Sequence, residues 1–349
     1  MLLVAIPHTA PPIWPTVLPG RFAGSFQRDS AEGCSIALIG LPDDTGVRLN
    51  AGRPGARLGP AAFRAALARF GSVHDASLQR PISVRVFDAG DVVPAPGGGE
   101  TALHETHTRI TEALLAVHRA GLVPVCIGGG HDLTFPAVRA LALHARSESA
   151  DPALRLGGIN IDAHTDVRET VGSGMPFRAL IEHGLLDPAH FVELGLGRFT
   201  NAPEHVSWLA GRQTTLITID TLRGDAGGAL VEAAFSLASL RTKPPADPRP
   251  AFFSFDLDAL DGSLAPGVSA VNPDGLAVPA AVHLVEMAAR NPFIRHFDFM
   301  ELCPPHDDPP FDPCNPVAVG RTARIAALLF IHLVSAFADR SLRRHGDSA

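Results

Sequence analysis

The sequence of 349 residues contains no tyrosine and only one lysine, Lys243. A chain without tyrosine cannot use a tyrosine hydroxyl to stabilise an oxyanion. The single lysine lies in the proline-rich stretch Thr242-Lys243-Pro244-Pro245, which argues against a lysine nucleophile or a Schiff base. All other basic residues are arginines, so any recognition of carboxylates would use planar, two-pronged guanidinium groups.

Cysteine and long apolar runs are also scarce. Cys34, Cys126, Cys303 and Cys314 form neither a disulfide framework nor a paired-cysteine zinc motif, so a reducing, cytoplasmic location is expected. No run of 18 or more apolar residues is free of charge and proline, so we expect no membrane span. The N-terminus begins apolar but has no basic leader, so we expect no signal peptide. A net charge of −7 argues against nucleic acid or an anionic membrane as partner.

Short apolar runs alternate with segments of helical periodicity, and this alternation is typical of a mainly parallel sheet. Eight runs predict strands, at residues 35–40, 84–87, 123–127, 156–161, 192–195, 216–219, 252–255 and 294–299. Helices are expected near residues 60–69, 101–120, 134–146, 201–209, 226–240, 278–290 and 318–338. The fold class is therefore α/β. We expect one catalytic domain over residues 35–340, with an N-terminal extension at 1–34 and a polar tail at 341–349.

Three of the expected strands end in clusters of acids and imidazoles. The clusters are Gly128-Gly-Gly-His131-Asp132, Asp162-Ala-His164-Thr-Asp166 and Ser254-Phe-Asp256-Leu-Asp258-Ala-Leu-Asp261. Ligands of parallel sheets bind at the carboxyl ends of the strands. Residues two apart in extended backbone point the same way, so the side chains of the second cluster are expected to converge.

Carboxylates that share one buried place need a cation to neutralise them. Two imidazoles and four carboxylates are enough to hold two divalent ions, and an oxygen-rich set with some nitrogen suits Mn²⁺. These candidate metal ligands are His131, Asp162, His164, Asp166, Asp256 and Asp258. The alternative for any one of them is an ordinary polar residue or helix cap at a strand end. Three clusters at three strand ends favour the metal site.

The three motifs, followed by Ala265-Pro-Gly267, resemble the metal-binding signatures of the ureohydrolase (arginase/agmatinase) superfamily over about residues 35–338. The resemblance implies a three-layer α/β/α sandwich with an eight-stranded, mainly parallel sheet. It also implies two Mn²⁺ ions per subunit, bound by the six candidate ligands, and a homo-oligomer. By family position, Asp166 would transfer the proton and Glu301 would pair with the cationic N–C–N group of a small-molecule substrate. Asp298 and Asp261 would be supporting residues.

Two stretches are most similar to formimidoylglutamases. Ser173-Gly174-Met-Pro-Phe-Arg178 stands where arginases and agmatinases usually carry His-Gly, and residues 44–55 resemble a loop of the same subfamily. The resemblance implies hydrolysis of N-formimidoyl-L-glutamate to L-glutamate and formamide, a step of histidine degradation. Candidates for binding its two carboxylates and polar groups are Arg48, Asn50, Arg53, Ser173 and Arg178. The alternatives are surface arginines and, for Asn50, a residue that holds a tight turn.

Other functions stay open from the sequence. A guanidino hydrolase such as agmatinase, arginase or a guanidino-acid hydrolase would release urea from the same fold. A histone-deacetylase-like amidohydrolase would need a tyrosine, which the chain lacks. A binding protein without catalysis would bury its ligand set unpaired, which is costly. Cys303 and Cys314 flank a proline-rich loop and are either a disulfide or two isolated thiols.

Overall fold

The structure is a computed structural model, and it describes residues 5–225, 228–239 and 249–340. Its strands are β1 Thr9–Ala10, β2 Ile36–Leu41, β3 His74–Asp75, β4 Arg80–Pro81, β5 Val86–Val92, β6 Val123–Gly128, β7 Leu156–Ile161, β8 Leu186–Leu196, β9 Thr215–Thr218, β10 Ala251–Asp256 and β11 Ile294–Met300. The α-helices are α1 Thr45–Leu49, α2 Gly59–Leu67, α3 Glu100–Arg119, α4 Thr134–Glu148, α5 Pro176–Glu182, α6 Pro203–Ala210, α7 Ile219–Gly224, α8 Ala229–Ser239, α9 Val278–Arg290 and α10 Arg321–Phe337. Short 3₁₀ helices span η1 Phe22–Ser25, η2 Ala56–Leu58, η3 His131–Leu133, η4 Leu257–Ala259 and η5 Pro304–His306.

Nine strands form the main sheet, in the order β1-β5-β2-β6-β11-β10-β7-β8-β9. The eight longer strands all run parallel, and only the two-residue β1 pairs antiparallel, with β5 at the edge. The sequence predicts all eight parallel strands. It misses β1, because a two-residue edge strand has too few residues to show a period of two. The sheet therefore has nine strands instead of the eight expected.

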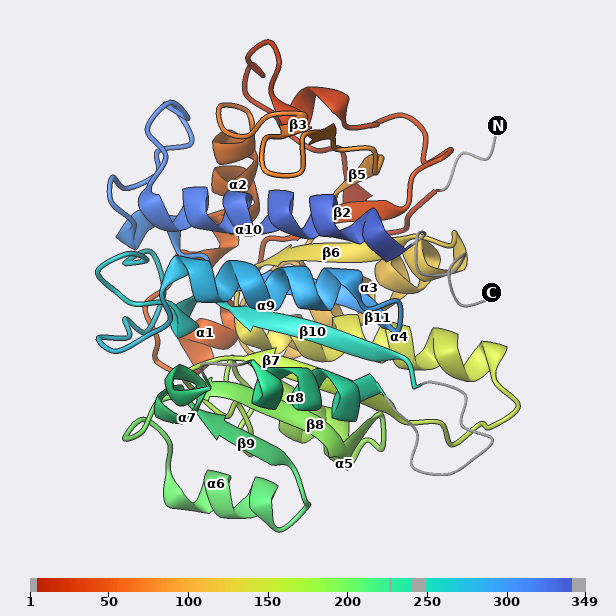
Figure 1. Ribbon diagram of the computed structural model, residues 1–349, viewed down its shortest axis with the longest axis vertical. Coiled ribbons are helices and arrows are strands. Elements are labelled where there is room, and N and C mark those ends of the chain that lie inside the picture. The colour runs from red at the N-terminus through yellow and green to blue at the C-terminus, as the bar shows by residue number, and fades with distance from the viewer. Residues whose placement is uncertain (1–4, 226–227, 240–248, 341–349) are drawn as a thin grey trace.

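Helices cover both faces of this sheet, which makes the three-layer α/β/α sandwich that the family resemblance implies (Figure 1). Alternate residues of β2 show the two faces, since Ile36 and Leu38 pack with α2, α9 and α10, whereas Ala37 and Ile39 pack with α3 and α4. Both faces of the strands are buried, so the strands read as continuous apolar runs. None of the helices in the described part of the chain is both long and apolar enough to span a bilayer.

The segment before β2 packs onto the domain. Residues Thr9 and Ala10 add β1 to the sheet, and the buried Phe22 and Phe26 rings pack against Phe330 of α10. The described part of the expected N-terminal extension thus packs against the same core as the residues that follow it.

The seven predicted helices correspond to α2, α3, α4, α6, α8, α9 and α10, with ends that differ by up to three residues in the described part of the chain. Short helices α1, α5 and α7 lie where no helix was predicted, because one or two turns carry too little periodicity to stand out. Lys243, the tail at 341–349 and residues 226, 227 and 240 of a predicted helix lie outside the described residues.

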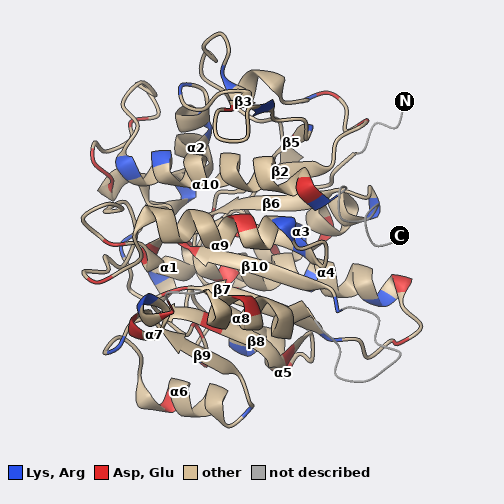
Figure 2. Ribbon diagram, viewed as in Figure 1, with Lys and Arg blue, Asp and Glu red and all other residues tan. Residues whose placement is uncertain are grey.

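Charge is mixed over the molecule. Figure 2 shows basic and acidic positions interspersed on helices and loops of this side, with few in the strands. This distribution agrees with the modest net charge of −7.

Candidate metal centre and active site

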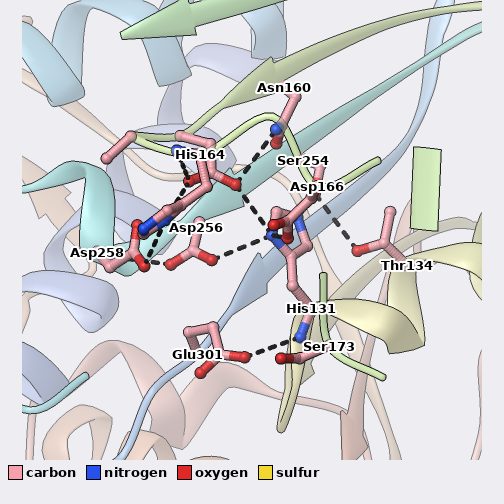
Figure 3. A network of polar contacts seen from close by, with 12 residues as sticks. His131, Thr134, Asn160, His164, Asp166, Ser173, Ser254, Asp256, Asp258 and Glu301 are labelled. Atoms are coloured by element: carbon pink, nitrogen blue, oxygen red, sulfur yellow. Dashed lines mark hydrogen bonds and ion pairs between the residues drawn. The ribbon is translucent and has the colours of Figure 1, made fainter. Parts of the chain in front are cut away.

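The polar strand ends meet because β6, β11, β10 and β7 are consecutive neighbours in the sheet. His131 follows β6, Asp162 follows β7, Asp256 ends β10 and Glu301 follows β11. All four strands are parallel, so their carboxyl ends share one edge. Figure 3 shows that the side chains from these strand ends point toward one another.

One imidazole nitrogen lies at the centre of the first ligand group. The Nδ1 atom of His131 lies 3.2 Å from Asp162 Oδ2 and 3.0 Å from both Asp166 Oδ2 and Asp256 Oδ2. Burial alone would lower the pKa of His131, but the three carboxylates raise it well above its ordinary value. A single ring nitrogen has one proton at most, so it can donate to only one of three converging oxygens.

A second group adjoins the first. His164 Nδ1 lies 3.1 Å from Asp258 Oδ2 and 3.4 Å from Asp162 Oδ1. The Asp258 carboxylate raises the pKa of His164 strongly, and burial raises the pKa of Asp258 to about 6. The two oxygens of Asp162 thus face the two different groups.

The donor set fits divalent cations. In each group the ligand atoms of different residues lie within 4.8 Å of one another, and the two groups together contain all six candidate ligands. His131 Nδ1 and Asp258 Oδ1 are buried and make no hydrogen bond. The four carboxylates, three buried and one partly buried, would repel one another without a cation, and the mixture of oxygen and nitrogen donors suits Mn²⁺.

Local backbone geometry fixes the carboxylates. Asp162 Oδ1 accepts the backbone N–H of His164 at 2.7 Å, and Asp256 Oδ1 accepts that of Asp258 at 2.7 Å. Each aspartate therefore closes a turn directly after its strand. Asp166 and Glu301 have positive φ angles of 45° and 63°, a strained conformation that is common at functional sites.

A glycine lets the His131 loop approach its neighbour. A Cβ added to Gly129 would lie 1.7 Å from the carbonyl oxygen of Asp43, which is closer than any real contact. The Gly130 N–H donates to that carbonyl at 3.0 Å. Only glycine permits this approach, and the approach sets the start of the segment that carries His131.

Glu301 lies beside the cluster with one free oxygen. Its Oε1 accepts the backbone N–H of His131 at 3.0 Å, whereas its Oε2 is buried without a hydrogen-bond partner (Figure 3). Burial, reinforced by Asp258, raises the pKa of Glu301 to about 8. A buried oxygen without a partner at this position is available to a substrate group.

Ser254 and Asp298 support the imidazole from behind. His131 Nε2 lies 2.9 Å from Ser254 Oγ, and Ser254 in turn donates to Asp298 Oδ1. Asp298 also accepts from Thr134 Oγ1 at 3.2 Å. This arrangement agrees with a supporting position for Asp298. Asp261, by contrast, is hydrogen-bonded to Ser263 in an exposed turn.

Of two candidate arginines near the start of the chain's first helix, Arg48 belongs to α1 and Arg53 follows it. Arg53 donates to the backbone oxygens of Val268 and Ser269, at 2.6 and 3.0 Å, and is otherwise exposed. Ser269 lies near Glu301 and lowers the pKa of its carboxyl group. Arg48 is half exposed and forms an ion pair with Asp44 at 2.9 Å.

Asn50 and Ser173 lie together on neighbouring loops. The Asn50 amide lies 3.0 Å from Ser173 Oγ, and a Cβ added to Gly130 would lie 3.6 Å from the Cβ of Ser173. Ser173 thus lies next to the loop that carries His131, as Figure 3 shows.

Arg178 is engaged elsewhere. Its guanidinium binds Glu169 at 2.7 Å and Glu182 at 2.9 Å and lies over the Trp208 ring. It lines a cavity of about 390 Å³ together with Arg168. The structure therefore does not bring Arg178 into contact with the six ligand residues.

Arg168, which was not among the predicted site residues, stands two residues after Asp166. Its side chain is exposed and packs against Gly174, and the described residues offer it no ion pair. The four cysteines are all free, so Cys303 and Cys314 are two isolated thiols, one buried and one exposed.

Known proteins share this fold and these motifs. The sequence model of the arginase family matches residues 34–335. The chain is 33% identical to a formimidoylglutamase of Aromatoleum aromaticum over 320 residues, which cover 87% of this chain and 84% of that protein. It is 29% identical to the human mitochondrial guanidino acid hydrolase, over 88% of this chain and 79% of that protein.

A solved structure is also similar to this chain in fold. The Trypanosoma cruzi formiminoglutamase with Mn²⁺ superimposes with a TM-score of 0.78 at 32% identity, covering 92% of this chain and 99% of that one.

Proposed function

The chain belongs to the arginase family and is a hydrolase of C–N bonds in linear amidines, and on this premise we propose that it converts N-formimidoyl-L-glutamate and water to L-glutamate and formamide. The observation that carries the reaction type is the cluster of His131, Asp162, His164, Asp166, Asp256 and Asp258 with the free oxygen of Glu301 beside it. Similarity to several formimidoylglutamases supports the choice of substrate.

The six ligands would hold two Mn²⁺ ions, and Asp162 belongs to both ligand groups. Ions bound here would lower the pKa of a water molecule and so make a nucleophile available at neutral pH. The protein must then position the amidine carbon, move one proton and keep the leaving nitrogen neutral.

Asp166 is the proposed proton carrier. Its side chain is 14% exposed, and its Oδ2 faces His131 in the ligand group. A carboxylate at this edge of the cluster can accept the proton of the attacking water and pass it to the departing nitrogen. Asp166→Asn should therefore lower kcat by about 10²- to 10⁴-fold.

Glu301 is the proposed partner of the substrate cation. Its buried Oε2 has no hydrogen bond, and the formimino group is a cationic N–C–N unit with N–H donors. A charge-assisted pair between them would hold the reacting carbon over the ligand cluster. Glu301→Gln keeps the shape but removes the charge, so we expect a large loss of kcat/KM while the metal still binds.

The arginines beside the site suit the acidic tail of this substrate. Arg53 lies next to Ser269, which is near Glu301, and Arg48 of α1 and Arg168 are exposed. Guanidinium groups bind carboxylates in a bidentate manner, and the proposed substrate has two carboxylates. Asn50 and Ser173 would add neutral hydrogen bonds.

A guanidino hydrolase is the second candidate. The human guanidino acid hydrolase and a guanidinopropionase of Pseudomonas aeruginosa are each 29% identical to the chain. A guanidino acid also has an acidic tail, so the arginines favour it over a substrate with a cationic tail. It would give urea instead of formamide.

One experiment separates the two. The Mn²⁺-loaded protein is incubated in parallel with N-formimidoyl-L-glutamate, agmatine, arginine and guanidino acids, and formamide and urea are assayed separately. Formamide from the first compound alone supports the proposal. Urea from any guanidino compound without formamide contradicts it.

The acidic tail can be tested with a matched pair of variants. Arg53→Gln should raise KM at least about tenfold with little change in kcat, because it removes a charged hydrogen bond of about 1.5 kcal/mol or more. Arg57→Gln is the control, since Arg57 is 52% exposed and its guanidinium faces Asp44 at 3.6 Å. Equal KM values for the two variants would remove Arg53 from the binding site.

Further expectations belong to the same proposal. We expect a single catalytic domain over residues 35–340, a homo-oligomer and a cytoplasmic enzyme. Analytical ultracentrifugation of the Mn²⁺-loaded protein measures the subunit number directly.

A further inference from the structure

A buried acid lies behind the metal ligands and is not used by the proposed reaction. Glu193 of β8 faces Asn160 of β7, and the two are register partners in the sheet. Both side chains are completely buried. Asn160 Nδ2 donates to Glu193 Oε2 at 2.8 Å and contacts Asp162 Oδ2 at 3.3 Å. Asn160 therefore stands between Glu193 and Asp162 (Figure 3 shows Asn160).

The pair leaves two buried oxygens without hydrogen bonds. Glu193 Oε1 and Asn160 Oδ1 both lack a partner. No arginine, lysine or histidine forms an ion pair with Glu193 in the described part of the chain. An ionised carboxylate buried without a cation is very costly, and it would also add a fifth negative charge beside the four aspartates.

A single proton accounts for both oxygens. A neutral carboxylic acid and a primary amide can form two hydrogen bonds at once, because each group has one donor and one acceptor on the facing side. With the proton on Glu193 Oε1, that O–H donates to Asn160 Oδ1 while Asn160 Nδ2 donates to Glu193 Oε2. The second hydrogen of Nδ2 is then available to Asp162 Oδ2. Burial and the nearby Asp162 both raise the pKa of Glu193 well above its ordinary value, which agrees with this assignment.

We propose that Glu193 is held as a neutral carboxylic acid in a two-point hydrogen bond with Asn160, and that this pair is a positioning unit for Asp162. Asp162 is the aspartate that belongs to both ligand groups, so its orientation affects both. The neutral acid fixes the Asn160 amide and adds no charge to the cluster. The inference rests on the proposed function only in that Asp162 binds metal.

Infrared spectroscopy tests the protonation directly. The Mn²⁺-loaded protein at neutral pH should show the carbonyl band of a buried protonated carboxylic acid, and this band should be absent from Glu193→Gln. The difference spectrum between the two proteins isolates Glu193 from other protonated acids. The inference is overturned if the difference spectrum contains a carboxylate band instead.

Metal affinity tests the positioning. Glu193→Gln replaces the acid O–H by an amide N–H of similar shape, so both hydrogen bonds to Asn160 persist and Mn²⁺ affinity should stay near the wild-type value. Glu193→Leu removes both bonds and should lower Mn²⁺ affinity about 10- to 100-fold. Glu182→Gln, which changes a half-exposed acid of α5, is the matched control and should leave the affinity unchanged.

The two variants test the neutral state of Glu193 and its positioning role separately. A tenfold or larger loss of affinity in Glu193→Gln would mean that the negative charge is needed and would refute the neutral acid. Wild-type affinity in a folded Glu193→Leu would refute the positioning role. If Glu193→Leu does not fold, the comparison of wild type with Glu193→Gln still decides. Neither readout uses the substrate, so a failed formamide assay does not affect the result.

Discussion

The buried ion pair of Arg64 gives the sharpest stability prediction. Arg64 lies on α2 with its side chain 2% exposed, and its Nε and Nη2 atoms bind the two carboxylate oxygens of Asp88 on β5 at 2.9 Å each. Its Nη1 also binds Asp91 at 2.6 Å. Trp14 donates to Asp88 Oδ2 at 2.7 Å, which ties the N-terminal segment to the same group. Arg64→Met keeps the apolar stem and removes the charge.

The expected cost follows from what remains around Asp88. Its side chain is fully buried, and among the described residues it keeps the N–H donors of Trp14 and Gly90. Removal of one partner from a buried pair costs about 3 to 5 kcal/mol, because the other charge is left unpaired. The ion pair of Arg64 with Asp91 contributes little to this cost, since the Asp91 side chain is 26% exposed. The folding equilibrium should therefore shift by a factor of roughly 10² to 10³ or more.

Urea unfolding followed by circular dichroism measures this loss, at fixed Mn²⁺ concentration. Arg198→Met is the control, since Arg198 and Asp220 lie 3.8 Å apart with side chains 67% and 51% exposed. An exposed pair of this kind contributes about 0 to 1 kcal/mol. Arg64→Met with Asp88→Asn should recover part of the loss, because the stranded charge is gone. A cost below 1 kcal/mol for Arg64→Met, equal to the control, would refute the reasoning.

Three further predictions concern a glycine in the His131 loop, the loss of stability at acidic pH, and the removal of Mn²⁺. Gly129→Ala should lower the free energy of unfolding by at least about 2 kcal/mol and weaken Mn²⁺ binding, because the new Cβ meets a backbone oxygen. Gly98→Ala is the control, since open space surrounds Gly98, and it should change neither urea unfolding nor Mn²⁺ binding. Burial, aided by the neighbouring imidazoles, holds the pKa of His118 well below 6.5, so the unfolded chain takes up a proton that the folded chain excludes. The free energy of unfolding should therefore decrease as the pH falls below 6.5, by up to about 1.4 kcal/mol per pH unit. His118→Phe should flatten this acid limb in thermal melts, and His104→Phe on the exposed side of the same helix should not. Removal of Mn²⁺ with a chelator should lower the melting temperature, and Mn²⁺ at 100 times its Kd should restore about 2.7 kcal/mol; an unchanged melting temperature would contradict a metal site in the folded protein.

The sequence by itself determined the sheet and the candidate ligand set. The eight parallel strands were recognisable because both faces of each strand are covered, which requires continuous apolar runs. The six candidate ligands were recognisable because each follows or ends such a run within a few residues. These are local properties of the chain, so a linear pattern is enough to reveal them.

Only the tertiary structure decided which partners the remaining side chains meet. The sequence made Arg178 a candidate for binding the substrate tail. In the structure its guanidinium forms ion pairs with Glu169 and Glu182 and lies over the Trp208 ring. Glu193 and Asn160 are 33 residues apart in the chain and meet only through the register of β7 and β8. Whether a charged side chain is paired, and with what, depends on contacts between distant segments. The order of residues along the chain thus indicates the strands and the candidate ligands. Which side chains contact one another depends on how the strands pair in the sheet.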